Sequence, residues 1–303
     1  MQIIVLGAGA IGSLYGAKLA SANEVTLIGR AEHAAAINSR GLRIEGLEPQ
    51  VVWVPAATKI DQIGPDALVL LTTKVSGSAA ALAPIAPLVR EDTTILCLQN
   101  GLGSERIARR ALGDRGIVLR GITQFGAIFE RAGVIQYMAG GYTLVEQHKR
   151  SDRVAAVLTA AGLDCRISPN IAADVWHKLV YNCVVNPITA ILGCEVGGIA
   201  NPQLAPLKQL VIDECLAVAA TQGLTFDVDF MREITDVFGA SRNIVSMLQD
   251  LRRGHHTEID YMNGAVAALG SQHDVTCPVN RALTAIIKAM EAPSLLPEKM
   301  LQT

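Results

Sequence analysis

The sequence has few aromatic residues, almost no net charge and no long apolar run. Aromatic residues make up 4% of its 303 residues and hydrophobic residues 50%, so aliphatic side chains and alanine must fill the core. The formal net charge is −2 and no block of like charges occurs, which argues against a nucleic-acid or anionic-membrane surface. The charge-free run from Leu179 to Cys194 is shorter than the roughly 20 residues of a spanning helix. We therefore expect no membrane segment.

Closely paired cysteines are also missing. The six cysteines lie in apolar contexts and include no C-x-x-C pair, so neither a disulfide framework nor a metal site is expected. The N-terminus lacks the basic region and cleavage site of an export signal. Together these absences predict a cytoplasmic protein.

The first half alternates β-branched runs with helical patterns, which is typical of a parallel α/β sheet. A chain of this length forms one large or two medium domains. The expected strands are Ile3 to Leu6, Glu24 to Ile28, Val51 to Val54, Ala67 to Leu71, Thr94 to Leu98, Ile117 to Ile122, Val134 to Tyr137, Tyr142 to Glu146 and Leu163 to Ile167.

The pattern changes after Ser168-Pro169-Asn170, and no strand is expected beyond it. Helices are expected near 171–192, 203–222, 227–238, 242–252, 257–272 and 279–290. The sequence thus predicts an α/β fold with a Rossmann-type domain over residues 1–168, followed by an all-α domain over residues 169–303. The apolar helices of this second domain could supply a homodimer interface.

A glycine-rich stretch, "IIVLGAGAIG", joins the first strand to the first helix. Glycines in such a turn permit a tight bend, the close approach of a pyrophosphate and close strand-to-helix packing. A purely structural glycine turn is the alternative, whereas a Walker phosphate loop is excluded because Ser13 stands where a lysine is required. The predicted dinucleotide-binding residues are Gly7, Ala8, Gly9, Ala10, Ile11 and Gly12.

The end of the second strand indicates which dinucleotide binds. The acidic residue that selects NAD is absent from "VTLIGR", and Arg30 suits the 2′-phosphate of NADP. A solvated surface arginine is the alternative. Lys74 and Asn100 follow the fourth and fifth expected strands, at the edge of an α/β sheet where ligands bind.

The stretch "WHKLVYNCVVNP" carries three polar residues at intervals of four. At about 100° per residue, Lys178, Asn182 and Asn186 share one helix face. A partly desolvated ammonium can donate a proton to an oxyanion, and the two amides can bind a carboxylate or hydroxyl. Pro187 should kink the helix. The alternative is a lysine that extends to solvent from a packed helix, beside two incidental asparagines.

A second polar group lies in "SMLQDLRRGHHTEIDYMNG". Ser246 and Asp250 are one helical turn apart. Glu258 falls in the first turn of the next expected helix, where the helix dipole favours a carboxylate. Glu258 could pair with Lys178, bind a ribose or substrate hydroxyl, or only begin the helix.

These stretches together resemble the ketopantoate reductases, which are NADPH-dependent 2-dehydropantoate 2-reductases. The resemblance covers nearly the whole chain through "GAGAIG", "TTK", "QNG", "GITQFGA", "AGVIQYMAGG", "WHKLVYNCVVNPITA" and "SMLQDLRRGHHTEIDYMNG". It implies a Rossmann domain, a helical domain, NADPH as cofactor and reduction of the C2 ketone of ketopantoate to give pantoate for pantothenate and coenzyme A.

The resemblance also implies roles for individual residues. Lys178 and Glu258 would be catalytic, with Lys178 the general acid. The implied substrate ligands are Lys178, Asn182, Asn186, Ser246 and Asn100, and the implied cofactor ligands beyond the glycine turn are Arg30, Lys74, Asn100, Ala127 and Glu258. The chain departs from the family pattern at Ala132, where a proline is common, and in the loop "CEVGG", which lacks an asparagine found in some members.

Two other functions stay open from the sequence. One is an NADPH-dependent reductase of another branched 2-oxo acid on the same scaffold. The other is a module that senses NADPH without turnover, against which the presence of both Lys178 and Glu258 argues.

Overall fold

Residues 1–113 and 115–292 are described by the structure, a computed structural model. The chain divides into two compact units. The first comprises Met1–Gln99 and Gly103–Ile171, and the second comprises Asn100–Leu102 and the residues from Ala172 onward. A short segment from the middle of the chain thus belongs to the second unit.

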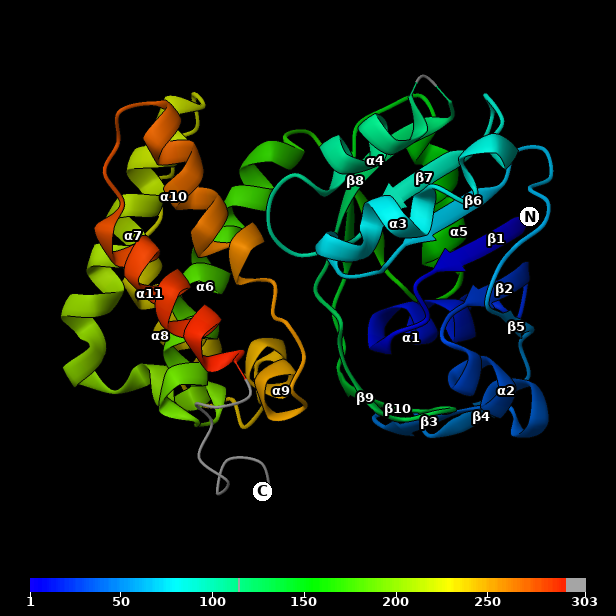
Figure 1. The fold of residues 1–303 in the computed structure, drawn as a ribbon, viewed down its shortest axis with the longest axis horizontal. Helices are drawn as coiled ribbons and strands as arrows, with labels where there is room; N and C mark the ends of the chain where they lie inside the picture. Colours follow the sequence, from blue (N-terminus) through cyan, green and yellow to red (C-terminus); the bar gives the residue numbers. More distant parts are fainter. Residues whose placement is uncertain (114, 293–303) are drawn as a thin grey trace. The chain divides into compact units, whose positions relative to one another are not determined.

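The first unit is built on an eight-stranded sheet with the order β12-β11-β8-β7-β6-β1-β2-β5 (Figure 1). Its central strands are apolar runs that are buried along almost their whole length, as expected for strands covered on both faces. Every neighbouring pair of strands is parallel except β8 and β11, which are antiparallel. The strands are β1 (Gln2–Leu6), β2 (Glu24–Ile28), β5 (Ala56–Ala57), β6 (Leu68–Leu71), β7 (Thr94–Cys97), β8 (Ile117–Thr123), β11 (Thr143–Glu146) and β12 (Cys165–Ser168).

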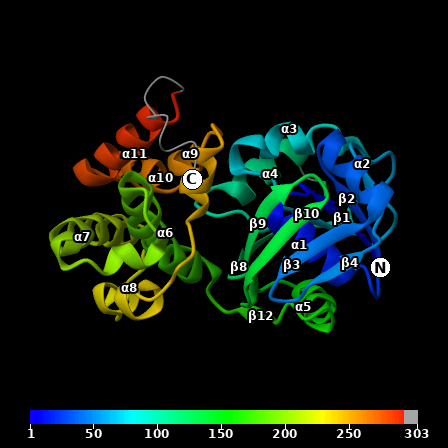
Figure 2. The same cartoon turned by 90° about the horizontal axis from the view of Figure 1, so that it is seen from below.

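A second sheet has four strands in the order β4-β3-β10-β9. They are β3 (Leu42–Gly46), β4 (Gln50–Val52), β9 (Gly126–Arg131) and β10 (Val134–Ala139). Helix α1 (Ala10–Leu19) contacts β1 and β2 of the large sheet as well as β3, β9 and β10, so it lies between the two sheets (Figure 2). The expected strands at 51–54 and 134–137 therefore form a separate layer with two strands that the sequence pattern did not reveal.

Helices connect the strands of the first unit. They are α2 (Ala31–Arg40), η1 (Val75–Gly77), α3 (Ser78–Leu82), η2 (Ala86–Leu88), α4 (Ser104–Leu112) and α5 (Ser151–Ala160), where η marks a 3₁₀ helix. The apolar core on one face of the large sheet includes Leu14, Tyr15 and Leu27, and the core on the other face includes Ile4, Leu71 and Leu82.

All the regular secondary structure among the described residues of the second unit is helical, as expected. Its elements are α6 (Ile171–Leu192), η3 (Val196–Ala200), η4 (Pro202–Leu204), α7 (Ala205–Thr221), α8 (Phe230–Phe238), α9 (Ser246–Arg252), η5 (Ile259–Tyr261), α10 (Asn263–Gln272) and α11 (Pro278–Met290). Its core includes Trp176, Val184, Cys215, Leu251 and Ile287. In the described parts of the chain, no helix has both the length and the apolar character to cross a bilayer.

One expected helix, 257–272, is interrupted. A 3₁₀ turn over Ile259–Tyr261 is followed by Met262, whose backbone angles (φ −112°, ψ −104°) are not helical, and α10 begins only at Asn263. Glu258 therefore caps a short turn rather than lying in the first turn of a long helix.

Candidate functional site

The turn after β1 depends on glycine at two positions. Gly7 has φ +113°, and a Cβ on it would lie 2.4 Å from the backbone nitrogen of Thr73. A Cβ on Gly12 would lie 2.3 Å from the carbonyl oxygen of Gly7. Gly9 is different, because a Cβ there would meet no described atom within 4 Å. Gly7 and Gly12 are therefore needed for packing, while Gly9 leaves open space at the mouth of α1.

The N-terminus of α1 suits an anion. Gly9 is its N-cap, no side chain caps it, and its first turn holds no acidic residue. The amide of Ser13 donates to the carbonyl of Gly9 at 2.9 Å, so the N–H groups of Ala10, Ile11 and Gly12 precede the first intrahelical bond. Together with the helix dipole, these groups can receive a phosphate.

The glycine turn also contacts the ends of β2 and β6. The amides of Gly7 and Ala8 donate to the carbonyl of Ile28 at 3.0 and 2.8 Å, and the hydroxyl of Thr72 donates to the carbonyl of Gly7 at 2.9 Å. Arg30 and Lys74 each follow these contact points by two residues, and Arg30 is exposed. Since β2 and β6 flank β1 on opposite sides, this edge is the point where the strand order reverses, the usual ligand position in such sheets.

Ala127 lies on β9 of the second sheet, half-buried, and packs against the core that surrounds α1. No strand was expected over Gly126–Arg131. Contacts between α1 and β9 nevertheless bring this strand beside the helix that begins at the glycine turn.

Helix α6 presents the predicted polar face of the second unit. Lys178 and Asn182 are half-buried, and Asn186 is buried at 8% exposure. The Nδ2 group of Asn182 is buried and has no hydrogen-bond partner among the described residues. An unsatisfied buried donor costs about 1–3 kcal/mol, so this amide is suited to a group that the protein itself does not supply.

Pro187 does not end α6, which continues to Leu192. Proline has no N–H, so the carbonyl of Cys183 loses its ordinary partner four residues ahead. The Nδ2 group of Asn263 replaces that partner at 2.9 Å and also donates to the Oδ1 atom of Asn280 at 2.9 Å. Asn280 in turn donates from its own Nδ2 to Glu214 at 2.7 Å. The sequence pattern gave no signal for this buried network.

The turn that carries Glu258 gathers two other predicted residues. Leu102 donates its amide to the carbonyl of Tyr261 at 2.9 Å, and a Cβ on Gly101 (φ +78°) would lie 2.2 Å from that oxygen, so the segment with Asn100 packs on this turn. Asn186 donates from Nδ2 to the sulfur of Met262 at 3.5 Å, at the turn's other end.

Ser246 is the exposed first residue of α9, and none of the contacts just described reaches it. Among residues 1–113 and 115–292, no group of three or more His, Cys, Asp or Glu side chains is placed to hold a metal ion. Of the predicted site residues, the Asn186 amide contacts the 258–262 turn and Glu258 is part of it.

Comparison with known proteins decides the family. The sequence profile of ketopantoate reductase PanE/ApbA matches residues 3–150, and the profile of its C-terminal domain matches residues 170–291. The 2-dehydropantoate 2-reductase of Pyrococcus horikoshii is 39% identical over 300 residues, covering 96% of this chain and 98% of that protein. The chain belongs to the ketopantoate reductase family. The resemblance seen in the sequence is thereby confirmed.

Further matches include two ketopantoate reductases and one dehydrogenase of a different name. The 2-dehydropantoate 2-reductase of Vibrio cholerae is 30% identical over 96% of this chain and 98% of its own length. The crystal structure of a PanE/ApbA family ketopantoate reductase from Ralstonia eutropha matches with a TM-score of 0.88, 30% identity and 99% coverage of both chains. D-mandelate dehydrogenase with NADH and anilino(oxo)acetate matches with a TM-score of 0.88 at 27% identity, covering 96% of this chain and 98% of that one. The expected fold and oxidoreductase class are confirmed.

Proposed function

We propose that this protein catalyses the NADPH-dependent reduction of 2-dehydropantoate to pantoate, a step toward pantothenate and coenzyme A. The observation that carries the substrate site is the unpaired, buried amide of Asn182 on the face of α6 that also presents Lys178 and Asn186. Family membership and the names of the curated relatives support the specific reaction.

The chain's own residues would act on a 2-oxo acid as follows. When bound, NADPH would supply the hydride that reduces the C2 carbonyl carbon. The Lys178 ammonium donates a proton to the carbonyl oxygen, so that an alcohol forms. Asn182, Asn186 and Ser246 bind the substrate carboxylate and hydroxyl without adding charge. Glu258 on the 258–262 turn, and Asn100 on the segment that packs against this turn, help to orient the substrate or the cofactor.

We propose that residues 1–168 bind the dinucleotide and that residues 169–303 bind the substrate. The glycine turn from Gly7 to Gly12 would hold the pyrophosphate. Arg30 would bind the 2′-phosphate that distinguishes NADPH from NADH, and Lys74 and the backbone near Ala127 would complete the cofactor site. The absence of an acidic residue from the stretch "VTLIGR" at the end of β2 supports NADPH.

The proposal also covers the protein's cellular location and its oligomeric state. We place the enzyme in the cytoplasm, where its cysteines stay reduced; all six are free thiols in the structure. Exposed apolar side chains on the helices of the second unit, such as Leu210 and Ile286, are available to a homodimer. Sedimentation of the purified protein would measure its oligomeric state.

Substrate preference tests the proposed reaction. NADPH oxidation should be followed with ketopantoate beside 2-oxoisovalerate, pyruvate, oxaloacetate and benzoylformate, the last because D-mandelate dehydrogenase shares this fold. We expect the highest kcat/KM with ketopantoate. A preference of tenfold or more for another acid would overturn the assignment of ketopantoate as substrate. If none of these acids were reduced, the alternative of a module that senses NADPH without turnover would be favoured.

A further inference from the structure

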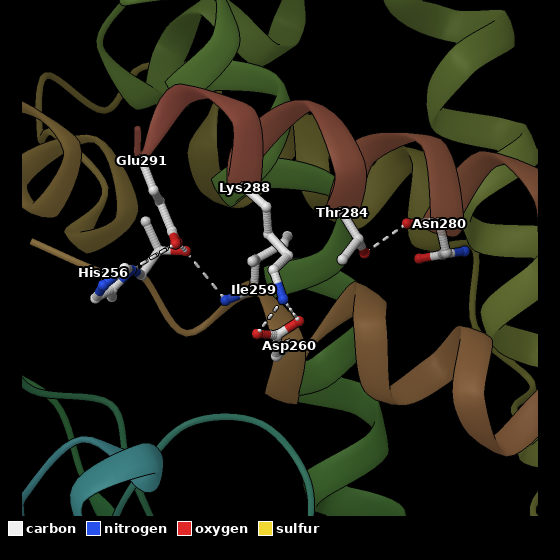
Figure 3. Close-up of polar contacts among 8 residues, drawn as sticks. His256, Ile259, Asp260, Asn280, Thr284, Lys288 and Glu291 are labelled. Carbon is white, nitrogen blue, oxygen red and sulfur yellow. Dashed lines mark hydrogen bonds and ion pairs between the residues drawn. The ribbon is translucent and has the colours of Figure 1, made fainter. Parts of the chain in front are cut away.

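The turn that carries Glu258 is held from both sides by one helix, α11 (Figure 3). On its N-terminal side, Glu291 accepts hydrogen bonds from the amide and the hydroxyl of Thr257, at 2.8 and 2.7 Å. On its C-terminal side, the Lys288 ammonium contacts both carboxylate oxygens of Asp260, at 3.0 and 2.9 Å. Glu258 lies between these two anchor points in the chain.

Glu291 occupies an unusual place for an acid. It is the C-cap residue of α11, where the helix dipole disfavours negative charge. Its side chain is nevertheless only 10% exposed and also contacts Nδ1 of His256 at 2.9 Å. Burial alone would raise the pKa of the Glu291 carboxyl, but the bonds from His256 and Thr257 outweigh burial and lower it. The contacts with residues 256 and 257 therefore keep this carboxylate charged, although the C-terminal end of the helix disfavours its charge.

The bonds to Thr257 extend into the turn itself. The Thr257 hydroxyl, which donates to Glu291, also accepts the amide of Ile259 at 3.2 Å. The amide of Tyr261 donates to the carbonyl of Glu258 at 3.0 Å. A continuous set of hydrogen bonds thus runs from Glu291 through Thr257 to the residues on either side of Glu258, and loss of the Glu291 carboxylate would release its first member.

We propose that Glu291 is a positioning residue that fixes the Glu258 carboxylate for the reaction, with Lys288 in a lesser supporting role. This inference rests on the proposed function, because it takes Glu258 as part of the reduction site. Glu291 acts only through the 256–260 segment. The contribution of Lys288 is smaller, because its ion pair with Asp260 is half-exposed on both sides, and such pairs contribute little.

The experiment compares four variants of the full-length enzyme. Glu291→Ala removes all contacts to residues 256 and 257. Glu291→Gln keeps an acceptor for Thr257 and a polar group for His256, so it serves as the conservative rescue. Arg281→Ala is the matched control, since Arg281 lies on the same helix but bonds Ser271 instead. Glu258→Ala supplies the background for a double-mutant cycle.

In kinetics with ketopantoate and NADPH, we expect Glu291→Ala to lower kcat/KM about ten- to a hundredfold, as small misplacements of catalytic groups do. Glu291→Gln should stay within about threefold of the unaltered enzyme, and Arg281→Ala within about twofold. In the Glu258→Ala background, Glu291→Ala should cost less than about twofold, because the group it positions is already absent. Equal losses in both backgrounds, no loss at all, or no rescue by glutamine would overturn the proposal.

Amide hydrogen exchange separates this inference from the proposed reaction. The Thr257 amide should exchange at least about tenfold faster in Glu291→Ala than in the unaltered protein, and at an unchanged rate in Arg281→Ala. Unchanged exchange in Glu291→Ala would show that Glu291 does not hold the turn, whatever the substrate. If exchange behaves as expected but the unaltered enzyme does not reduce ketopantoate, the proposed substrate fails while the anchoring of the turn stands.

Discussion

Replacing Asn263 by alanine tests whether its side chain compensates for Pro187 in the middle of α6. Asn263 is fully buried, and its Nδ2 group serves two buried acceptors, the carbonyl of Cys183 and Oδ1 of Asn280. Without Asn263, the Cys183 carbonyl loses this donor and Oδ1 of Asn280 keeps only the weak Cys215 thiol donor at 3.9 Å, and each loss costs about 1–3 kcal/mol. The Oδ1 atom of Asn263 is itself buried without a partner among the described residues, and its removal returns a similar amount. We expect a net loss of about 1–3 kcal/mol in the free energy of unfolding.

A double-mutant cycle isolates the part that belongs to Pro187. In Pro187→Ala, the new N–H at position 187 can bond the Cys183 carbonyl, so that Asn263 no longer has to. Asn263→Ala should then cost about 1–2 kcal/mol less than it does beside Pro187. The coupling between the two positions measures the replacement bond directly.

Tryptophan fluorescence during urea unfolding is a suitable assay. The chain has two tryptophans, and Trp176 lies in the core of the second unit, whereas Trp53 of the first unit is 69% exposed. Trp53→Phe makes Trp176 the sole reporter of the helical unit. Costs of Asn263→Ala that agree within about 0.5 kcal/mol with and without Pro187 would refute the reasoning.

Three further predictions concern the site and the first unit. Lys178→Ala should lower kcat by about 10²–10⁴ while NADPH binding, measured by fluorescence titration, weakens far less; equal losses would contradict the proton-donor role. Arg30→Asp should invert the ratio of NADPH to NADH affinity, with NADPH weakened about ten- to a hundredfold, and an unchanged ratio in parallel titrations would remove Arg30 from the cofactor site. Burial lowers the pKa of His33, whose Nδ1 accepts a hydrogen bond from the amide of Gly133 at 2.9 Å, so the unfolded chain takes up this proton first as the pH falls. The free energy of unfolding should therefore decrease from pH 6.5 downward, and in urea unfolding it should decrease less steeply with falling pH for His33→Gln. The same pH dependence in both proteins would exclude His33 as the cause.

The parts of the fold that followed from sequence are those set by local pattern. Strands such as β6 and β7 are short apolar runs buried at every position, and α6 has the bounds that the sequence predicted, Ile171–Leu192. The glycine turn was equally readable, because the steric demands on Gly7 and Gly12 come from elements close to β1. Its contacts with the ends of β2 and β6 follow from the strand order of a dinucleotide fold.

The second sheet could not be read in this way. Its strand β3 has a clear alternation, with Leu42 and Ile44 buried and Arg43 exposed, but it pairs with β10, some 90 residues away. An alternating pattern predicts a strand and its buried face, whereas it does not name the partner strand. Ala127 belongs to the second sheet through β9, which forms a hairpin with β10 and places Ala127 opposite Tyr137.

Polar residues of the helical unit show the same limit. Glu214, Asn263 and Asn280 lie within apolar helices and have no spacing that predicts a network, because each partner comes from a different helix. The role of Glu291 could not be predicted from the sequence either, because its hydrogen bonds to Thr257 form only when α11 packs beside the 256–260 segment. The non-helical backbone at Met262, which shortens the helix expected over 257–272, follows directly after this segment.

Asn182 and Asn263 both lie in apolar helices, but they differ in their hydrogen bonds. The Nδ2 group of Asn263 is used twice within the protein, so its energetic role is structural. That of Asn182 is equally shielded from solvent but unused by any described residue. A donor left unsatisfied costs about 1–3 kcal/mol, and a ligand oxygen that accepts from it recovers this amount, which corresponds to roughly 5- to 150-fold in affinity. Because an amide lowers the energy of a carboxylate or hydroxyl oxygen but not of a hydrocarbon, this difference favours an oxygen-rich acid over an apolar ligand beside Lys178.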